Sequence, residues 1–272
     1  MQKVVLITGA SSGMGRATAL FLSQNGFLVY AASRNPQKLQ ELTSKTFIPI
    51  KLDVTDSQSI LNVVQTIQAT HKKIDILINN AGYGLVATVE DVTEAEMFAQ
   101  FNVNVFGVLR VTQAVIPLMR EKNEGLIINI SSFLGKIGLP LLTLYNSSKY
   151  AVEGITDSLR YELKDFNIRV HSIMPGFFDT NFAKENLVTN SATFAKNSPY
   201  ATLVSNLAPV IVEQINSGNN PSEVGKMILE IIQNEKFPAR ATIGEKAQKF
   251  IPMRKELSDE DFERRVREYY TL

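Results

Sequence analysis

The chain has 272 residues, of which 44% are hydrophobic and 20% are charged, and its formal net charge is +1. This composition suits a globular protein with a substantial core, and the charge balance gives no general attraction to nucleic acid or to an anionic membrane. The absence of cysteine excludes disulfides, zinc–thiolate sites and thiol nucleophiles. We expect a cytoplasmic location, because we find no signal peptide and no apolar run near the roughly 18 residues of a membrane span.

Short apolar segments alternate with amphipathic ones along most of the chain. Strands are predicted at 4–8, 27–32, 47–52, 74–79, 126–131 and 169–174, and helices at 15–25, near 36–43, and at 57–70, 94–102, 107–122 and 145–165. Strands that are apolar throughout, rather than alternating, are typical of parallel strands covered on both faces. The pattern therefore predicts an α/β fold, a doubly wound parallel sheet in a single domain over 1–272.

The alternation stops after the sixth strand. Residues 177–220 contain no predicted strand and are rich in apolar side chains, which favours an apolar lid over a substrate site; packing against the fold is an equal alternative. The charged residues noted in this segment are Lys184, Glu185, Lys196 and Glu213. A helix at 221–234 and a strand at 239–244 follow. The tail at 245–272 has no assigned role, and the alternating charges within it are typical of a solvated helix.

A glycine-rich turn, Thr8-Gly9-Ala10-Ser11-Ser12-Gly13-Met14-Gly15, lies between the first strand and the first helix. Glycine lets the chain turn tightly beside a phosphate, and the helix N-terminus offers backbone N–H groups and a positive dipole end. The spacing is Gly-x-x-x-Gly-x-Gly, not the ordinary dinucleotide fingerprint. We expect this turn to bind the cofactor through Gly9, Ser11, Ser12, Gly13, Met14 and Gly15. A glycine-rich turn without a ligand is the alternative.

The end of the second strand bears on the choice of cofactor. An NAD enzyme would usually place a carboxylate there, about 20 residues after the glycines, to bind the ribose 2′-hydroxyl. This sequence has Ser33 and Arg34 instead. Arginine offers planar donors to phosphate oxygens, whereas a carboxylate would repel a 2′-phosphate. We therefore expect NADP(H), with Ser11 adding a hydroxyl contact; an ordinary surface arginine is the alternative.

Two further strand ends carry candidate cofactor contacts. The third strand is followed by Asp53 and Val54, and the fourth by Asn80, Ala81 and Gly82. The Asp53 carboxylate could accept from the adenine amino group or cap the next helix, although Asp56 is better placed for the cap. Small residues after the fourth strand allow a cofactor to lie against the backbone. Asn80 could equally tie neighbouring strands together.

Four polar residues are candidates for proton transfer. Tyr145 and Lys149 share one helix face, and an ammonium beside a phenol favours the phenolate and lowers its pKa. Ser132 follows the fifth strand, where its hydroxyl can donate to a substrate oxygen. Asn104, in a helical region, could hold a water that relays protons to Lys149. Each also has a plain structural alternative, namely packing, a surface charge, a turn residue or a buried polar group.

Taken together, these motifs resemble the short-chain dehydrogenase/reductase family in its ordinary, non-extended branch, with a Rossmann-type fold. The matching residues are Thr8-Gly9-x-x-x-Gly13-x-Gly15, Asn79-Asn80-Ala81-Gly82, Asn104, Ser132, Tyr145-x-x-x-Lys149 and Pro175-Gly176. The resemblance implies that Tyr145 is the general acid/base, Ser132 the substrate-oxygen donor and Asn104 the proton-relay residue. It implies that Lys149 lowers the tyrosine pKa and binds the ribose.

The resemblance also implies a cofactor-covering segment, a quaternary structure and a reaction. The residues placed over the nicotinamide amide are Pro175, Gly176, Phe178 and Thr180. Many members are dimers or tetramers, so we expect a homo-oligomer. A weaker likeness points to 17β-hydroxysteroid and retinol dehydrogenases. The expected activity is hydride transfer between NADP(H) and a carbonyl or secondary alcohol of a hydrophobic small molecule, without a metal. The alternatives are a non-catalytic NADP(H)-sensing protein and a sugar-nucleotide epimerase or dehydratase.

Overall fold

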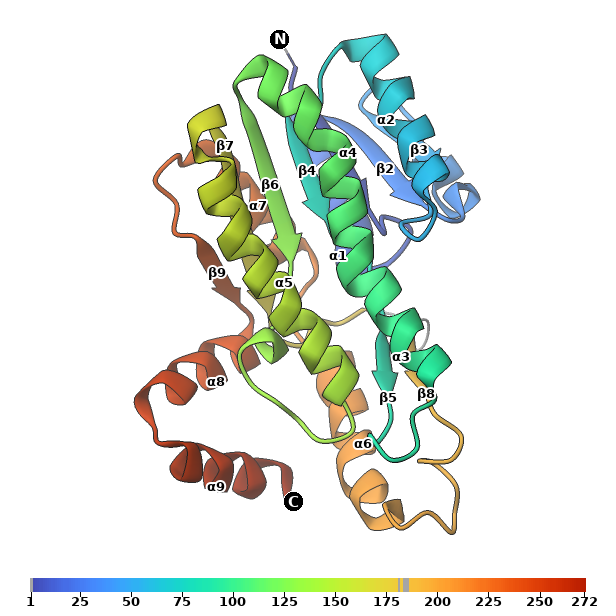
Figure 1. Ribbon diagram of the computed structural model, residues 1–272, viewed down its shortest axis with the longest axis vertical. Helices are drawn as coiled ribbons and strands as arrows, with labels where there is room; N and C mark the ends of the chain where they lie inside the picture. The colour runs from blue at the N-terminus through green and yellow to red at the C-terminus, as the bar shows by residue number, and fades with distance from the viewer. Residues whose placement is uncertain (1, 181, 183–185) are drawn as a thin grey trace.

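Seven parallel strands form one sheet through the middle of the molecule (Figure 1). The computed structural model describes residues 2–180, 182 and 186–272. The strands are β1 (Val4–Thr8), β2 (Leu28–Ser33), β3 (Phe47–Lys51), β4 (Ile76–Asn79), β6 (Gly125–Ile130), β7 (Ile168–Pro175) and β9 (Arg240–Ile243). Their order is β3-β2-β1-β4-β6-β7-β9. The winding reverses between β1 and β4, and ligands bind at such a switch point in open α/β sheets.

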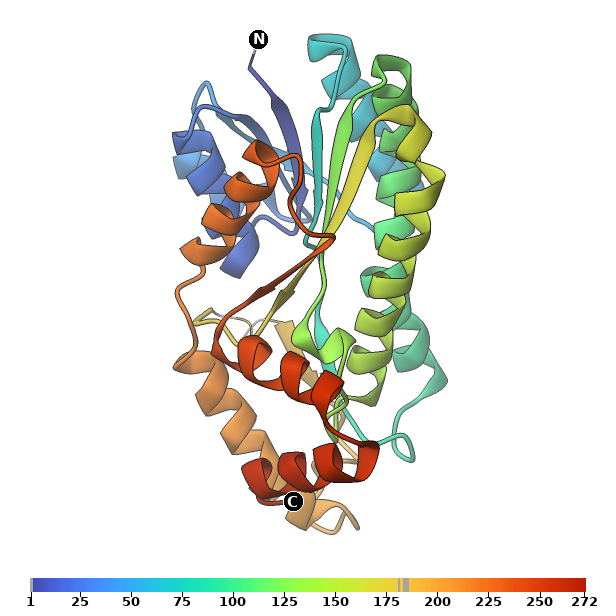
Figure 2. The same ribbon diagram turned by 90° about the vertical axis from the view of Figure 1, so that its left-hand side faces the viewer.

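Helices cover both faces of this sheet (Figure 2). One face carries α1 (Gly13–Gln24) and α7 (Ser222–Gln233), and the other carries α2 (Ser57–His71), α4 (Gly107–Lys122) and α5 (Thr143–Glu162). Because successive side chains of a strand point to opposite faces, Val4 and Leu6 join the core under α2, α4 and α5, whereas Val5 and Ile7 join the core under α1 and α7. The predicted doubly wound sheet, buried on both faces, is confirmed.

Local sequence determines where several helices begin. Asp56 caps α2, since its carboxylate accepts from the backbone N–H groups of Gln58 and Ser59 at 2.9 and 3.2 Å. Helix α3 (Glu94–Phe101) begins with a capping box in which Thr93 and Glu96 satisfy each other's backbone N–H groups. The predicted helix near 36–43 is a short 3₁₀-helix over Pro36–Leu42.

The region after β7 differs from the sequence prediction. It contains a short strand, β8 (Leu187–Thr189), which pairs in parallel with β5 (Gly84–Val86), and a helix, α6 (Ala201–Asn216). Strands of three residues are too short for a hydrophobic period to identify. The expectation that residues 177–220 hold no strand was therefore wrong. Lys184 and Glu185, which the sequence analysis noted in this segment, lie outside the described residues.

The C-terminal tail is more than a solvated helix. It folds into α8 (Glu245–Glu256) and α9 (Asp259–Tyr270), which pack with α6 beyond the end of the sheet (Figure 1). Phe262, Val266 and Tyr270 recur every four residues, so they share one face of α9, and all three are buried in this third core. The alternating charges occupy the other faces of α9, which is why the charge pattern alone suggested full solvation.

One helical stretch bears on the expectation of no membrane span. Residues Glu94–Lys122 run continuously through α3, a π-helical turn and α4, and they are long and apolar enough to cross a membrane by length and composition. Of its most apolar window, 44% is buried inside the protein. This stretch packs on α2, β4, β6 and α5. The core helix of a water-soluble protein passes the same test, so the stretch is weak evidence for a span.

Candidate active site

A cavity of about 1140 Å³ opens at the carboxyl ends of the parallel strands. Its lining begins at the glycine-rich turn after β1, continues past the ends of β2, β3 and β4, and reaches Tyr145 and Lys149 on α5. The segment after β7 contributes Thr180, Phe182 and Val188 to the wall. One cavity therefore joins the predicted phosphate-binding turn to Tyr145 and Lys149, although they lie more than 100 residues apart in the sequence, whereas Asn104 and Ser132 are not among its lining residues.

The glycine-rich turn is shaped by contacts that leave no room for side chains. Gly9 and Gly13 have φ angles of 66° and 52°, which favour glycine. A Cβ on Gly15 would lie 2.3 Å from Asn80 Nδ2 and 2.4 Å from the Gly9 carbonyl oxygen. Ser12 precedes α1 but makes no side-chain cap bond, so within the described part of the chain the first backbone N–H groups of this helix have no capping side chain. Such groups suit an anion, and the turn fits a cofactor pyrophosphate.

Asn80 has the structural role that the sequence analysis left open. Its Nδ2 donates to the carbonyl oxygens of Thr8 and Gly9 at 2.9 and 3.1 Å, and its backbone N–H donates to Thr8 Oγ1. The amide therefore ties the end of β4 to the start of the glycine-rich turn. Ala81 and Gly82 follow in the cavity wall, and a Cβ on Gly82 would lie 3.2 Å from Asn104 Oδ1 and 3.8 Å from Lys149 Nζ.

The ends of β2 and β3 form the other end of the cavity. Ser33 is buried there, its hydroxyl has no hydrogen-bond partner among the described residues, and the exposed Arg34 follows at the rim. Within the described part of the chain, Arg34 makes no ion pair or hydrogen bond. Asp53 accepts from the backbone N–H and the hydroxyl of Thr55, at 2.9 and 2.7 Å, so its side chain is held at the cavity wall beside Val54.

The candidate proton-transfer residues meet where α5 begins. Tyr145 and Lys149 lie on successive turns, and Lys149 Nζ is 5.6 Å from the centroid of the Tyr145 ring. Lys149 Nζ donates to the Ile130 carbonyl oxygen at the end of β6, at 2.9 Å. The Ser132 hydroxyl accepts from the Leu134 N–H at 3.1 Å and is hydrogen-bonded to the Tyr145 hydroxyl. The sheet edge thus brings Ser132, Tyr145 and Lys149 into one group.

Asn104 is held more tightly than the sequence predicts. It lies in a π-helical turn, Asn102–Phe106, between α3 and α4, and π turns are frequent at functional sites. Its Oδ1 accepts from the Tyr83 N–H, and its Nδ2 donates to the Tyr83 carbonyl oxygen and to Ser148 Oγ, at 3.0, 2.9 and 3.0 Å. Asn104 therefore fastens the chain after β4 to the second turn of α5, at Ser148 beside Lys149.

Burial dominates the charge state of the tyrosine–lysine pair. It raises the pKa of Tyr145 to about 12, and the hydrogen bond with Ser132 opposes this only in part. Burial also lowers the pKa of Lys149 to about 8, against the charge of Glu153. The sequence analysis expected the Lys149 ammonium to lower the tyrosine pKa. In the structure, burial opposes this effect, because removing both groups from water disfavours the phenolate as well as the ammonium, and the lowering of the tyrosine pKa by Lys149 stays a prediction.

Some predicted cofactor contacts lie away from the cavity wall. Thr180 lines it, and its side chain faces Gly13. Pro175 and Gly176 end β7 against β9, where the Gly176 N–H donates to the Ile243 carbonyl oxygen. Phe178 is buried and packs against Gly244. The backbone of Phe178 forms a parallel bridge with Asn219, and its side chain is part of the core rather than of the cavity wall.

Several lining residues were not identified from the sequence. They are Asn35, Lys38, Leu52, Thr55, Tyr83, Leu85, Glu96, Ala99, Asn102, Val103, Ile130, Ser131, Asn186 and Val188, whereas Phe182 belongs to the predicted apolar lid. Leu85 and Val188 come from the paired strands β5 and β8, which have no periodicity to reveal them. Glu96 belongs to a capping box that the sequence displays as Thr93-x-x-Glu96, but that pattern indicates only a helix start.

Comparison with known proteins bears on this site as a whole. Residues 3–190 match the short chain dehydrogenase family. The chain is 36% identical over 271 residues to a 3-ketodihydrosphingosine reductase of Bacteroides thetaiotaomicron, covering 99% of this chain and 98% of that protein. It is 40% identical over 184 residues to a 3-oxoacyl-(acyl-carrier-protein) reductase of Thermotoga maritima, covering 65% of this chain and 75% of that one.

A solved structure agrees with these relatives. The short-chain dehydrogenase from Streptomyces avermitilis superposes with a TM-score of 0.84 and 32% identity, over 100% of this chain and 96% of that one. The glycine-rich turn, the Ser132–Tyr145–Lys149 group and every strand of the sheet except β9 lie within the matched family region. The chain therefore belongs to the short-chain dehydrogenase/reductase family of oxidoreductases.

Proposed function

We propose that this protein is an NADP(H)-dependent oxidoreductase that interconverts a ketone and a secondary alcohol on a hydrophobic molecule. The observation that carries this proposal is one cavity that is lined by a glycine-rich, phosphate-binding type of turn at one end and by Tyr145 and Lys149 at the other, with Ser132 beside Tyr145. The relatives with named activities are reductases of 3-keto and 3-oxo compounds. They give no support to a cofactor-sensing protein without chemistry.

The residues have distinct tasks in this mechanism. When bound, NADPH supplies the hydride. Tyr145 holds the proton that the carbonyl oxygen takes up, and burial keeps this proton in place at neutral pH because it raises the tyrosine pKa to about 12. The Ser132 hydroxyl, hydrogen-bonded to Tyr145, orients the same oxygen and stabilises its developing charge. Lys149 keeps its ammonium beside the tyrosine and binds the nicotinamide ribose.

The preference for NADP(H) rests on Arg34. This exposed guanidinium stands at the cavity rim directly after β2, next to the unpartnered hydroxyl of Ser33. Both groups can donate to a 2′-phosphate. Arg34→Asp should therefore weaken NADPH binding by at least about tenfold and leave NADH binding nearly unchanged, because the new carboxylate repels only the phosphorylated ribose. Equal losses for the two cofactors, measured by fluorescence titration, would remove Arg34 from 2′-phosphate recognition.

The substrate proposed is a long-chain 3-keto compound with an amino group, such as 3-ketodihydrosphingosine. The Bacteroides relative named for this substrate aligns over 99% of this chain. Beyond Tyr145 the cavity wall includes the apolar side chains of Leu85, Phe182 and Val188, which suit an alkyl chain. The wall also holds the Glu96 carboxylate, whose pKa the Thr93 backbone hydrogen bond lowers, so it is ionised and suits an ammonium group.

Tyr145→Phe tests the mechanism. The variant should lose at least about a thousandfold in kcat with this ketone, because the proton donor is gone, and should retain NADPH affinity. Turnover is followed by the loss of NADPH absorbance, and affinity by fluorescence titration. Substantial activity in the variant would refute Tyr145 as the proton donor. If the wild-type protein bound NADPH and turned over no ketone in a panel that includes this substrate, the proposed activity would fail.

The homo-oligomer remains part of this proposal. Helices α4 and α5 expose Leu109, Tyr150 and Tyr161, which are 41%, 46% and 82% accessible. Apolar and aromatic side chains on neighbouring helices are suited to a protein interface. Light scattering on the purified protein measures the mass that decides this point.

A further inference from the structure

A buried carboxylate stands one helical turn beyond Lys149. Tyr145, Lys149 and Glu153 follow one another at intervals of four residues on α5, so their side chains lie along the same face of the helix. The side chain of Glu153 is only 3% accessible. A Cβ on Gly135, in the turn after Ser132, would lie 3.2 Å from Glu153 Cγ. Glu153 therefore packs directly behind the turn that carries Ser132.

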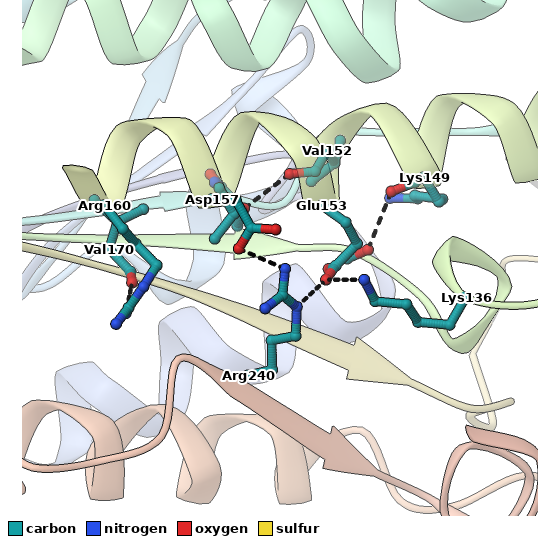
Figure 3. A network of polar contacts seen from close by, with 11 residues as sticks. Lys136, Lys149, Val152, Glu153, Asp157, Arg160, Val170 and Arg240 are labelled. Carbon is teal, nitrogen blue, oxygen red and sulfur yellow. Dashed lines mark hydrogen bonds and ion pairs between the residues drawn. The ribbon is translucent and has the colours of Figure 1, made fainter. Parts of the chain in front are cut away.

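Two cations from other elements hold this carboxylate. Arg240 Nε, from the edge strand β9, donates to Glu153 Oε2 at 2.6 Å, and Lys136 Nζ lies 3.5 Å from the same oxygen. Figure 3 shows Arg240 reaching across to α5, where it also contacts Asp157 Oδ1 at 2.6 Å. Asp157 is 50% accessible, so Glu153 is the member of this cluster most removed from water.

The second oxygen of the Glu153 carboxylate lacks the ion-pair partners of the first. Glu153 Oε1 is fully buried and has no hydrogen-bond partner within the described residues. A buried carboxylate oxygen without a donor costs stability, and the ion pairs with Arg240 and Lys136 compensate the charge at Oε2 only. Beyond these direct ion pairs, the negative charge of Glu153 also acts through space on buried cations nearby. Lys149 is the buried cation that can use it, and the charge of Glu153 does raise the Lys149 pKa against the larger effect of burial.

We propose that Glu153 is a positioning residue for Lys149. Its buried carboxylate, held in place by Arg240 of β9 and by Lys136, keeps the active-site lysine charged. The proposal rests on the function proposed above, where Lys149 acts as an ammonium. The charged or titratable groups around the carboxylate are Lys136, Lys149, Asp157, Arg240 and, one turn beyond Lys149, Tyr145. Arg240 partly neutralises Glu153, so the edge strand adjusts the charge that Lys149 experiences.

Two variants should shift the pH at which Lys149 loses its proton, in opposite directions. Glu153→Gln keeps the size of the side chain and removes its charge, so Lys149 should lose its proton at lower pH. Arg240→Gln removes the neutralising cation and leaves the carboxylate more effective, so Lys149 should keep its proton to higher pH. We expect displacements of roughly one pH unit, a tenfold change in the ionisation ratio. A loss of packing would not reverse sign between the two variants.

The measurement is the ionisation midpoint of Lys149, followed by NMR of lysine labelled with carbon-13 at Cε, with the resonance assigned from Lys149→Met. The alkaline limb of the kcat profile with NADPH and the ketone should move with it. Asp157→Asn is the matched control. It removes the charge of the other carboxylate that pairs with Arg240, and this carboxylate is half-exposed, so solvent screens its effect on Lys149. This control should leave the midpoint in place.

The outcomes separate this inference from the proposed function. Unchanged NMR midpoints in both variants, or displacements of the same sign, would overturn the role of Glu153. Displaced midpoints in a protein that does not reduce the ketone would support the coupling and refute the activity. If Glu153→Gln does not fold, as judged by its circular dichroism, the Arg240→Gln variant decides alone: a midpoint moved to higher pH supports the role, and any other result overturns it.

Discussion

Replacing Asn104 by alanine separates a structural role from a proton-relay role. The side chain is 1% accessible, and its amide makes three hydrogen bonds, two with the backbone of Tyr83 and one with Ser148. At about 1 kcal/mol for each bond lost in a buried site, Asn104→Ala should destabilise the protein by about 3 kcal/mol. For a chain of 272 residues this corresponds to a fall in Tm of about 5 °C.

Thermal unfolding followed by circular dichroism measures this change. Asn102→Ala is the matched control, because Asn102 lies in the same π-helical turn and its side chain makes no hydrogen bond within the described residues. Its Tm should stay within about 1 °C of the wild type. A Tm for Asn104→Ala that matched the control, together with a large loss of turnover, would refute the structural reasoning. Asn104 would then act chiefly on a relay water, as the sequence analysis expected.

Two further predictions follow from the geometry of the site. Gly15→Ala should weaken NADPH binding by at least about tenfold, because the new Cβ would overlap Asn80 Nδ2 and the Gly9 carbonyl oxygen at 2.3 and 2.4 Å. The control is Gly154→Ala, where nothing lies within 4 Å of the new Cβ, and it should leave the affinity unchanged. Equal NADPH affinities of the two variants, measured by titration, would contradict the predicted clash. The rate of ketone reduction should fall as pH rises through about 8, since burial lowers the Lys149 pKa to that value and the ammonium is the active form. A rate that stays level to pH about 10 would show that the Lys149 ammonium is not required.

The sequence alone determined the sheet and most of the candidate site. Parallel strands buried on both faces must be apolar throughout, so their positions could be read from continuous apolar runs. Gly9, Gly13 and Gly15 could be assigned to a phosphate-binding turn because backbone geometry at a strand-to-helix turn restricts the residue type. The four-residue spacing of Tyr145 and Lys149 placed both on one helix face. Such features depend on a few neighbouring residues.

Only the tertiary structure decided what long-range packing controls. The burial that raises the pKa of Tyr145 and lowers the pKa of Lys149 comes from elements distant in sequence, so its size could not be predicted from the four-residue spacing. The wall formed by β5 and β8 arises from segments about 100 residues apart, each only three residues long. In the sequence, Glu153 is only one polar residue of a predicted helix. The structure shows that Arg240, on the edge strand, holds its carboxylate. Charge and solvation depend on which groups surround a side chain in space, and local sequence patterns do not specify those neighbours.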